Sequence, residues 1–209
     1  MENDNTIIFN NLADCYKNPW IKDKKERQRI IDIVNKFGIK KGMQILEPGC
    51  GNGEFTPFIL KKIGKKGVVW LVDISDKMLK IAKRNLKNKK NLRYINCCAS
   101  KIPVEKNFFD MVIVFNSFPH FYPKKIFIKE FYRVLKNNGF LIIAHDFPRE
   151  KINRIHNKAN FDMDKNLLPG KREMFKMLKK QGFVIKRYDN KVYYLLIAIK
   201  IIYNVRSAI

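Results

Sequence analysis

Seven consecutive residues decide the fold: Glu47-Pro48-Gly49-Cys50-Gly51-Asn52-Gly53. The apolar run before them, 43–47, is typical of a short buried strand, and 54–63 is typical of a helix that Gly64 ends. Glycines let the chain turn sharply and leave its backbone bare, so a ligand can approach closely. The sequence therefore predicts a strand, a ligand-binding turn and a helix in direct succession.

The spacing of these glycines narrows the class of ligand. Gly49, Gly51 and Gly53 form G-x-G-x-G, whereas dinucleotide folds carry G-x-G-x-x-G and phosphate loops carry G-x-x-x-x-G-K-[ST]. Glu47, just before the turn, would repel a pyrophosphate and attract a cation. S-adenosylmethionine (SAM), with its sulfonium and ammonium groups, fits such a turn.

A second carboxylate lies where a nucleoside would need one. Asp73 ends the apolar run 68–72, twenty residues beyond Gly53. At this place in a strand-helix-strand unit an acid can accept hydrogen bonds from both ribose hydroxyls. By itself Asp73 could also be a helix cap, but with the glycine turn before it the ribose role is favoured.

Apolar runs and helical patterns alternate along the chain. Predominantly apolar runs predict strands at 43–47, 68–72, 92–97, 109–115 and 140–144. Helical patterns lie before, between and after them, at 24–37, 54–63, 76–88, 123–135 and 171–181. The runs 183–188 and 192–201 predict a hairpin, and 145–169 is expected to be irregular. Helices between buried strands imply a parallel sheet covered on both faces. The expected class is α/β: a Rossmann-like, mostly parallel seven-stranded sheet with an antiparallel C-terminal hairpin.

No linker or repeat divides the chain, so 1–209 is expected to be one domain. Residues 24–201 would form its core and 1–23 an N-terminal arm. The arm carries Phe9, Tyr16 and Trp20. These aromatic side chains either close over a substrate or simply pack on the domain.

Four stretches together resemble one family. They are Ile45 to Gly53, Leu71-Val72-Asp73-Ile74-Ser75, Phe108-Phe109-Asp110-Met111-Val112 and Arg133 to Gly139. The chain is similar to the class I SAM-dependent methyltransferases over about 24–200. Within them it resembles the small-molecule branch of the ubiquinone/menaquinone and arsenite methyltransferases.

This resemblance implies a set of cofactor contacts. Glu47, Gly49, Gly51 and Gly53, with Cys50 among them, match the turn around the methionine part of SAM. Asp73 matches the ribose acid, Ile74 the apolar residue on adenine, and Asn116 a contact to the methionine end. Where the family often has an Asp near adenine, this chain has Cys97-Cys98-Ala99. Cys98 and Ala99 are therefore assigned to the adenine, with a backbone N–H at Ala99 as the expected donor.

Three histidines follow strands or the segment after them: His120, His145 and His156. His145-Asp146 ends the strand at 140–144, at the edge where ligands bind in open α/β sheets. Three roles remain open for these four residues: a general base or substrate contact, a metal site, or pocket-lining groups without a chemical role. His145 is the first choice as base, then His120, and no metal ligand is assigned.

The formal net charge of +24 could indicate an anionic partner such as RNA, DNA or a membrane surface. The alternative is A/T-rich coding, because most basic residues are Lys and they are spread over almost every segment. Residues 116–119, Asn-Ser-Phe-Pro, contain neither a Pro-Cys nucleophile nor an Asn/Asp-Pro-Pro-aromatic run. A small-molecule acceptor is therefore favoured, an RNA methyltransferase is the alternative, and a SAM-binding protein without turnover is a third possibility.

The remaining features concern the compartment. The four cysteines contain no C-x-x-C pair, which favours a reducing cytoplasm. Residues 1–5 lack the basic start of a signal peptide. The apolar stretch 192–203 is too short to span a bilayer and is interrupted by Lys200, so no membrane partner is expected. The oligomeric state stays open.

Overall fold

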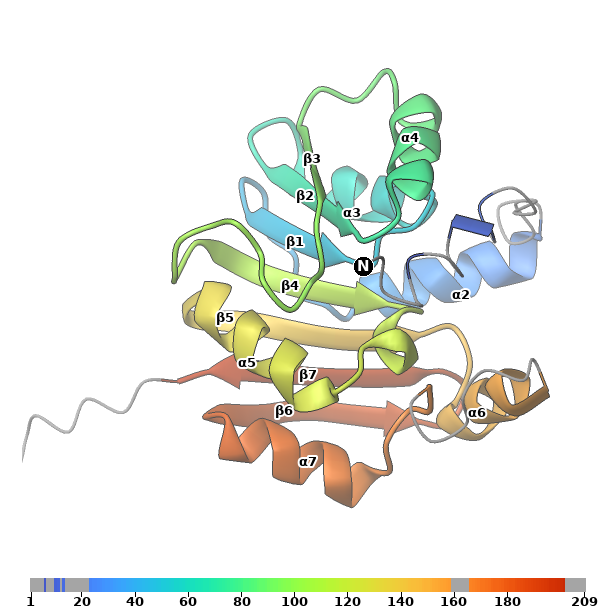
Figure 1. The fold of residues 1–209 in the computed structure, drawn as a ribbon, viewed down its shortest axis with the longest axis vertical. Helices are drawn as coiled ribbons and strands as arrows, with labels where there is room; N and C mark the ends of the chain where they lie inside the picture. Colours follow the sequence, from blue (N-terminus) through green and yellow to red (C-terminus); the bar gives the residue numbers. More distant parts are fainter. Residues whose placement is uncertain (1–5, 7–9, 12, 14–22, 159–165, 202–209) are drawn as a thin grey trace, which may run out of the picture.

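One seven-stranded sheet organises the computed structural model, which describes residues 6, 10–11, 13, 23–158 and 166–201. The strand order is β3-β2-β1-β4-β5-β7-β6 (Figure 1). Strands β1 to β5 are parallel, and β7 runs antiparallel to β5 and β6. The predicted mostly parallel sheet with its C-terminal hairpin is confirmed. The strands are β1 Gln44–Pro48, β2 Val68–Asp73, β3 Leu92–Asn96, β4 Phe109–Phe115, β5 Leu135–His145, β6 Phe183–Asn190 and β7 Tyr194–Lys200.

Helices cover both faces of this sheet (Figure 1). Side chains of α2, α3 and α4 share one buried cluster, and side chains of α5 and α7 share the other. Because successive side chains of a strand point to opposite faces, Met111 and Ile113 of β4 join the first cluster, whereas Val112 and Val114 join the second. The helices are α2 Lys24–Val34, α3 Thr56–Ile63, α4 Asp76–Asn85, α5 Lys124–Val134, α6 Arg149–Lys158 and α7 Lys171–Lys180, with a 3-10 turn η1 Phe118–His120.

The shared sheet supports the proposal that 24–201 form one domain. Within the described residues, every helix is too short or too polar to cross a bilayer. The arm aromatics Phe9, Tyr16 and Trp20 lie outside the described residues. Asn10 of the arm is described, and its side-chain Oδ1 accepts a hydrogen bond from the Ser75 hydroxyl at 2.6 Å.

The prediction of an irregular segment at 145–169 is wrong over 149–158, where α6 forms. Ile152 is the only residue of α6 that is buried, so the apolar pattern that signals a helix is nearly absent. The carbonyl of Pro148 accepts hydrogen bonds from the N–H groups of Lys151 and Ile152, which starts the first turn. Strand β5 also begins earlier than predicted, at Leu135.

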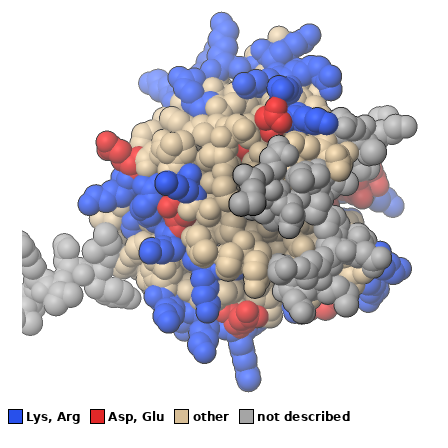
Figure 2. All heavy atoms as spheres, in the orientation of Figure 1, with Lys and Arg blue, Asp and Glu red and all other residues tan. Residues whose placement is uncertain are grey.

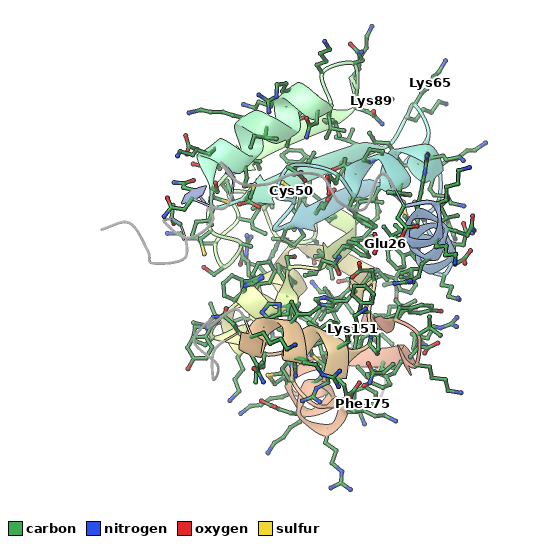
Figure 3. All side chains as sticks on the ribbon, turned by 90° about the vertical axis from the view of Figure 1, so that its right-hand side faces the viewer. Glu26, Cys50, Lys65, Lys89, Lys151 and Phe175 are labelled. Carbon is green, nitrogen blue, oxygen red and sulfur yellow. The ribbon has the colours of Figure 1, made fainter. Side chains whose placement is uncertain are left out.

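Positive charge is spread over the surface. Figure 2 shows Lys and Arg side chains around the whole margin of one face, with no single dense stripe. In Figure 3, Lys65 and Lys89 point outward at one end of the molecule, whereas Cys50 of the glycine turn lies in the interior. The distribution agrees with charge scattered along the sequence.

Candidate functional site

A cavity of about 410 Å³ opens at the carboxyl ends of β1, β2 and β4. The sheet order reverses between β1 and β4, since the chain moves outward from β1 to β3 on one side and from β4 onward on the other. Loops at such a switch point diverge and leave a crevice, which is where open α/β sheets bind ligands. The topology therefore puts the glycine turn, Asp73 and the end of β4 around one space.

The glycine turn is fastened to β2 by its own backbone. The N–H groups of Gly49 and Cys50 both donate to the carbonyl of Val72, at 2.7 and 3.1 Å. The N–H of Gly51 donates to the Asp73 carboxylate at 2.8 Å. The turn and the acid therefore form one connected unit before any ligand arrives.

The three glycines of the turn have positive φ, and each has a different neighbourhood. A Cβ on Gly49 would come 2.7 Å from Cβ of Ser117, so the end of β4 approaches the backbone closely there. A Cβ on Gly53 would come 2.8 Å from Leu86, beside α4. A Cβ on Gly51 would meet nothing within 4 Å, because this residue borders the cavity. Gly51 thus keeps space open, whereas Gly53 serves packing and does not line the cavity.

Asp73 ends β2 with a buried carboxylate. Besides the Gly51 N–H it accepts the N–H of Ser75 at 3.0 Å, through its other oxygen. Burial raises the pKa of Asp73, and the hydrogen bonds from the backbone at Ser75, Gly51 and Ile74 lower it. Each carboxylate oxygen can accept more than one hydrogen bond, so acceptor capacity remains for a ligand hydroxyl.

Glu47 is buried at the end of β1 and also lines the cavity. Its carboxylate accepts a hydrogen bond from the Thr56 hydroxyl at 2.9 Å. Burial raises the pKa of Glu47 to about 8; the Thr56 hydroxyl opposes this rise, and the negative charge of Asp73 adds to it. A cationic ligand beside Glu47 would stabilise the ionised form of its carboxyl group.

Glu54 is a third acid in this wall, and it did not emerge from sequence reasoning. Its side chain is buried and lines the cavity. Among the described lining residues there is no Lys or Arg, although the chain as a whole carries +24. The cavity is therefore lined by acidic groups inside a basic protein, and their ionised forms favour cationic ligands.

The side of the cavity near β3 is formed by Ile74 and by the thiol-containing segment 97–100. The Sγ of Cys98 and the Oγ of Ser100 lie 3.0 Å apart and share a hydrogen bond. Burial raises the pKa of Cys97 to about 11, so this thiol stays protonated at neutral pH. These side chains offer an apolar slot rather than a charged one.

The opposite side is apolar apart from the end of β4. Asn116 has a φ of 53°, and its side-chain Oδ1 accepts the N–H of Asp146 at 3.2 Å. Ser117 donates its hydroxyl to the carbonyl of Pro48 at 3.2 Å. Beyond them the wall is made by aromatic and aliphatic residues of α5 and of the segment between η1 and α5: Phe121, Tyr122, Pro123, Ile126 and Phe127. Tyr122 and Ile126 are about half exposed, and they mark the mouth of the cavity.

Only one of the three histidines lines the cavity, and it is His120. The ring of His156, from α6, lies 4.8 Å from the ring of His120, centroid to centroid. His145 is buried behind them against Tyr194, with ring centroids 6.0 Å apart. Burial lowers the pKa of His120 to about 4 and that of His145 to about 3, and repulsion between the histidines adds to both shifts. The rings of His120 and His145 are therefore uncharged at neutral pH, and burial also lowers the pKa of His156.

The polar side chains of Arg149 and Asn153, which follow His145 in the sequence, have partners elsewhere. Asn153 exchanges hydrogen bonds with the backbone of Leu168, and Arg149 donates to the same carbonyl. Neither His145, Asp146 nor His156 is among the cavity-lining residues. Within the part of the chain that the structure describes, no three His, Cys, Asp or Glu side chains are placed to hold a metal ion.

Most of the cofactor contacts proposed from sequence lie around this one cavity. Those that line it are Glu47, Gly49, Cys50, Gly51, Asp73, Ile74, Cys98, Ala99 and Asn116. Sequence reasoning did not find Glu54 or the apolar wall formed by α5 and the segment before it. An acid just before a helix is a visible signal, since it suits the helix N-terminus. Its burial, however, depends on contacts from elsewhere in the fold.

Comparison with known proteins agrees with this geometry. Residues 46–143 match the family model described as a methyltransferase domain. A demethylmenaquinone methyltransferase of Staphylococcus aureus is 30% identical over 137 residues, covering 65% of this chain and 57% of that protein. A ubiquinone/menaquinone biosynthesis C-methyltransferase of Nitrosospira multiformis is 27% identical over 208 residues, covering 88% and 85%. A SAM-dependent methyltransferase from Aquifex aeolicus has the same fold, with a TM-score of 0.71 at 22% identity over 87% of this chain and 95% of that one.

The chain is similar in sequence to the class I SAM-dependent methyltransferases and shares their fold. It spans about half the length of most of the curated relatives it matches. SAM is the cofactor of this family, and the residues present fit it. Gly51 leaves open space where a side chain would intrude, and the surrounding carboxylates suit a cationic nucleoside.

Proposed function

We propose that this protein transfers a methyl group from SAM to a small, largely apolar acceptor molecule. The observation that carries the proposal is the composition of the cavity, which is acidic at the glycine turn and apolar at α5 and the segment before it. The first part suits a cationic nucleoside, and the second suits an uncharged organic acceptor. The quinone substrates named for the relatives of Staphylococcus aureus and Nitrosospira multiformis support the same class of acceptor.

The cofactor contacts follow from the walls. Asp73 would accept the ribose hydroxyls, while Ile74, Cys98 and Ala99 would enclose the adenine. Glu47, Gly49, Cys50, Gly51 and Asn116 would surround the methionine part. Gly53 supports the turn through its packing beside Leu86 rather than by contact. A reducing cytoplasm is part of this proposal, since Cys50, Cys97 and Cys98 are free thiols.

The protein has few chemical tasks in this reaction, because SAM already carries an activated methyl group. SAM, when bound, supplies an activated methyl group whose bond to sulfur breaks as the new bond to the acceptor forms. The chain then has to align the acceptor, exclude water and receive a proton where the acceptor must lose one. The apolar wall of Phe121, Ile126 and Phe127 performs the first two tasks.

His120 is the group best placed to receive a proton, because it lines the cavity and is uncharged at neutral pH. His145, the first choice from sequence, lies behind it and supports the ring cluster rather than reaching the cavity. The proposal therefore gives the base role to His120, with His156 beside it and Asp146 outside the cavity.

An RNA acceptor is the alternative, and the site favours it less. A nucleic-acid backbone needs Lys or Arg at the site, and the described lining residues include neither. The test is turnover of isotopically labelled SAM with demethylmenaquinone and, separately, with tRNA. Label in the quinone supports the proposal, and label in tRNA alone replaces it. If calorimetry shows that neither SAM nor its demethylated product S-adenosylhomocysteine binds, both readings fail.

A further inference from the structure

Glu54 carries a buried carboxyl group. The residue is 4% exposed, and neither Oε1 nor Oε2 has a hydrogen-bond partner among the residues that the structure describes. Burial raises its pKa, and the nearby Asn52 side chain lowers it. A buried polar atom without a hydrogen-bond partner destabilises the folded state. Such an arrangement calls for a partner that arrives from outside the chain.

The other two acids of the wall differ in this respect. Glu47 already accepts the Thr56 hydroxyl, and both oxygens of Asp73 accept backbone N–H groups. Among these three acids, Glu54 is the one whose two buried oxygens lack a hydrogen bond of normal geometry within the described residues, and the Asn52 side chain is the polar neighbour that lowers its pKa. The donor hydrogens it lacks must therefore come from a ligand in the cavity that it lines.

We infer that Glu54 binds the α-ammonium group of the methionine part of SAM. This rests on the proposed function. Of the two positive groups of SAM, the ammonium carries three N–H donors, whereas the sulfonium carries none. A carboxylate that lacks hydrogen-bond donors can therefore be satisfied by the ammonium group but not by the sulfonium group. Charge-assisted N–H···O bonds of this kind are among the strongest in proteins.

A competing explanation is the start of α3, which lies two residues beyond Glu54. The N-terminus of a helix attracts an anion without any ligand. That explanation predicts an effect of Glu54 on folding but none on cofactor affinity. It also leaves both carboxylate oxygens without donors, although a side chain at the surface would obtain them from water.

The test is a three-ligand binding series on Glu54→Gln by calorimetry. S-adenosylhomocysteine keeps the ammonium but has a neutral sulfur, and 5′-methylthioadenosine lacks both the ammonium and the sulfonium. We expect SAM and S-adenosylhomocysteine each to bind about tenfold or more weakly than to the wild type, with 5′-methylthioadenosine unchanged. Glu105→Gln, which removes the same charge from an exposed position, should bind all three as the wild type does.

Each other outcome overturns the inference. Loss for SAM alone would place Glu54 at the sulfonium, loss for all three ligands would mean a structural role, and no loss would favour the helix explanation. If Glu54→Gln does not fold, the wild type decides the matter, since deaminated S-adenosylhomocysteine should bind at least about tenfold more weakly than the parent compound. Equal binding of the two would overturn the inference. In every case turnover of labelled SAM with demethylmenaquinone by the wild type shows separately that the proposed function itself stands.

Discussion

The carboxylate of Asp73 accepts the backbone N–H of Gly51 at 2.8 Å, which joins the end of β2 to the turn that follows β1. The two residues are 22 positions apart in the sequence, and the parallel pairing of β1 with β2 brings them together. The same acid that would bind a ribose therefore also fixes the shape of the turn. Changes at Asp73 should affect both.

Replacing Asp73 by Ala should weaken all adenosine ligands alike. The change removes the proposed acceptors for two ribose hydroxyls and frees the N–H groups of Gly51 and Ser75. Loss of charge-assisted hydrogen bonds worth about 3 kcal/mol would weaken binding of SAM, S-adenosylhomocysteine and 5′-methylthioadenosine by about 100-fold. Calorimetry measures this, and retained affinity for 5′-methylthioadenosine would remove Asp73 from the ribose site.

Cofactor affinity should depend on pH through Glu47. Its pKa in the ligand-free protein is raised to about 8, so below that pH a cationic ligand must expel a proton in order to bind. We expect the affinity for SAM to rise with pH, by at most about tenfold per unit, and to level off above pH 8. Proton release follows from calorimetry in buffers of different ionisation enthalpy. Glu47→Gln should flatten the profile, and an unchanged slope would assign the proton to another group.

The raised pKa of Glu47 should also make the stability of the ligand-free protein depend on pH. The unfolded carboxyl ionises near its ordinary value of 4.5, so the folded state holds one more proton between pH 4.5 and 8. Stability from this group is therefore present at low pH and is lost as the pH rises through that window. The histidines act in the opposite direction and over a lower range.

His145 should make the protein sensitive to acid. Its pKa is about 3 in the folded state, whereas the ordinary value is 6.5. Between these two pH values the unfolded chain therefore binds a proton that the folded chain does not bind. Stability is full above pH 6.5 and falls as the pH drops towards 3, by at most about 1.4 kcal/mol per unit from this residue. In His145→Leu the unfolding free energy, measured with denaturant at pH 7 and pH 5, should fall less than in the wild type. An equal fall in both proteins would show that His145 is not the sensitive group.

Lys200 should stabilise the far end of the sheet. Its buried ammonium donates to Asn107 Oδ1 and to the carbonyls of Tyr132 and Leu135, at 2.7–2.8 Å. Lys200→Met would leave these acceptors without a donor and should lower the unfolding free energy by about 2–3 kcal/mol. Lys186→Met, at an exposed position of β6, is the matched control and should change it by less than about 0.5 kcal/mol.

The role of Lys200 could not be predicted from the sequence. In the sequence it is a polar break in an apolar strand, and nothing nearby indicates that acceptors 65 to 93 residues away surround it. The glycine turn and Asp73 were predictable because their spacing is local and their order follows from alternating strands and helices. Glu54 and His145 differ from them: their burial depends on contacts from distant segments, which no local pattern encodes.

Two glycines of the same turn should respond differently to one methyl group. Gly51→Ala places its Cβ in open cavity space, so the fold should lose only the strain of a φ of 53°, about 1–2 kcal/mol, while affinity for SAM falls by tenfold or more. Gly53→Ala has similar strain at a φ of 78° and in addition drives its Cβ to 2.8 Å from Leu86. It should therefore unfold more easily than Gly51→Ala and yet, while folded, bind SAM better. Thermal unfolding and calorimetry on the two variants separate the effects. If Gly51→Ala binds SAM as the wild type does, the space beside Gly51 is not where the cofactor lies.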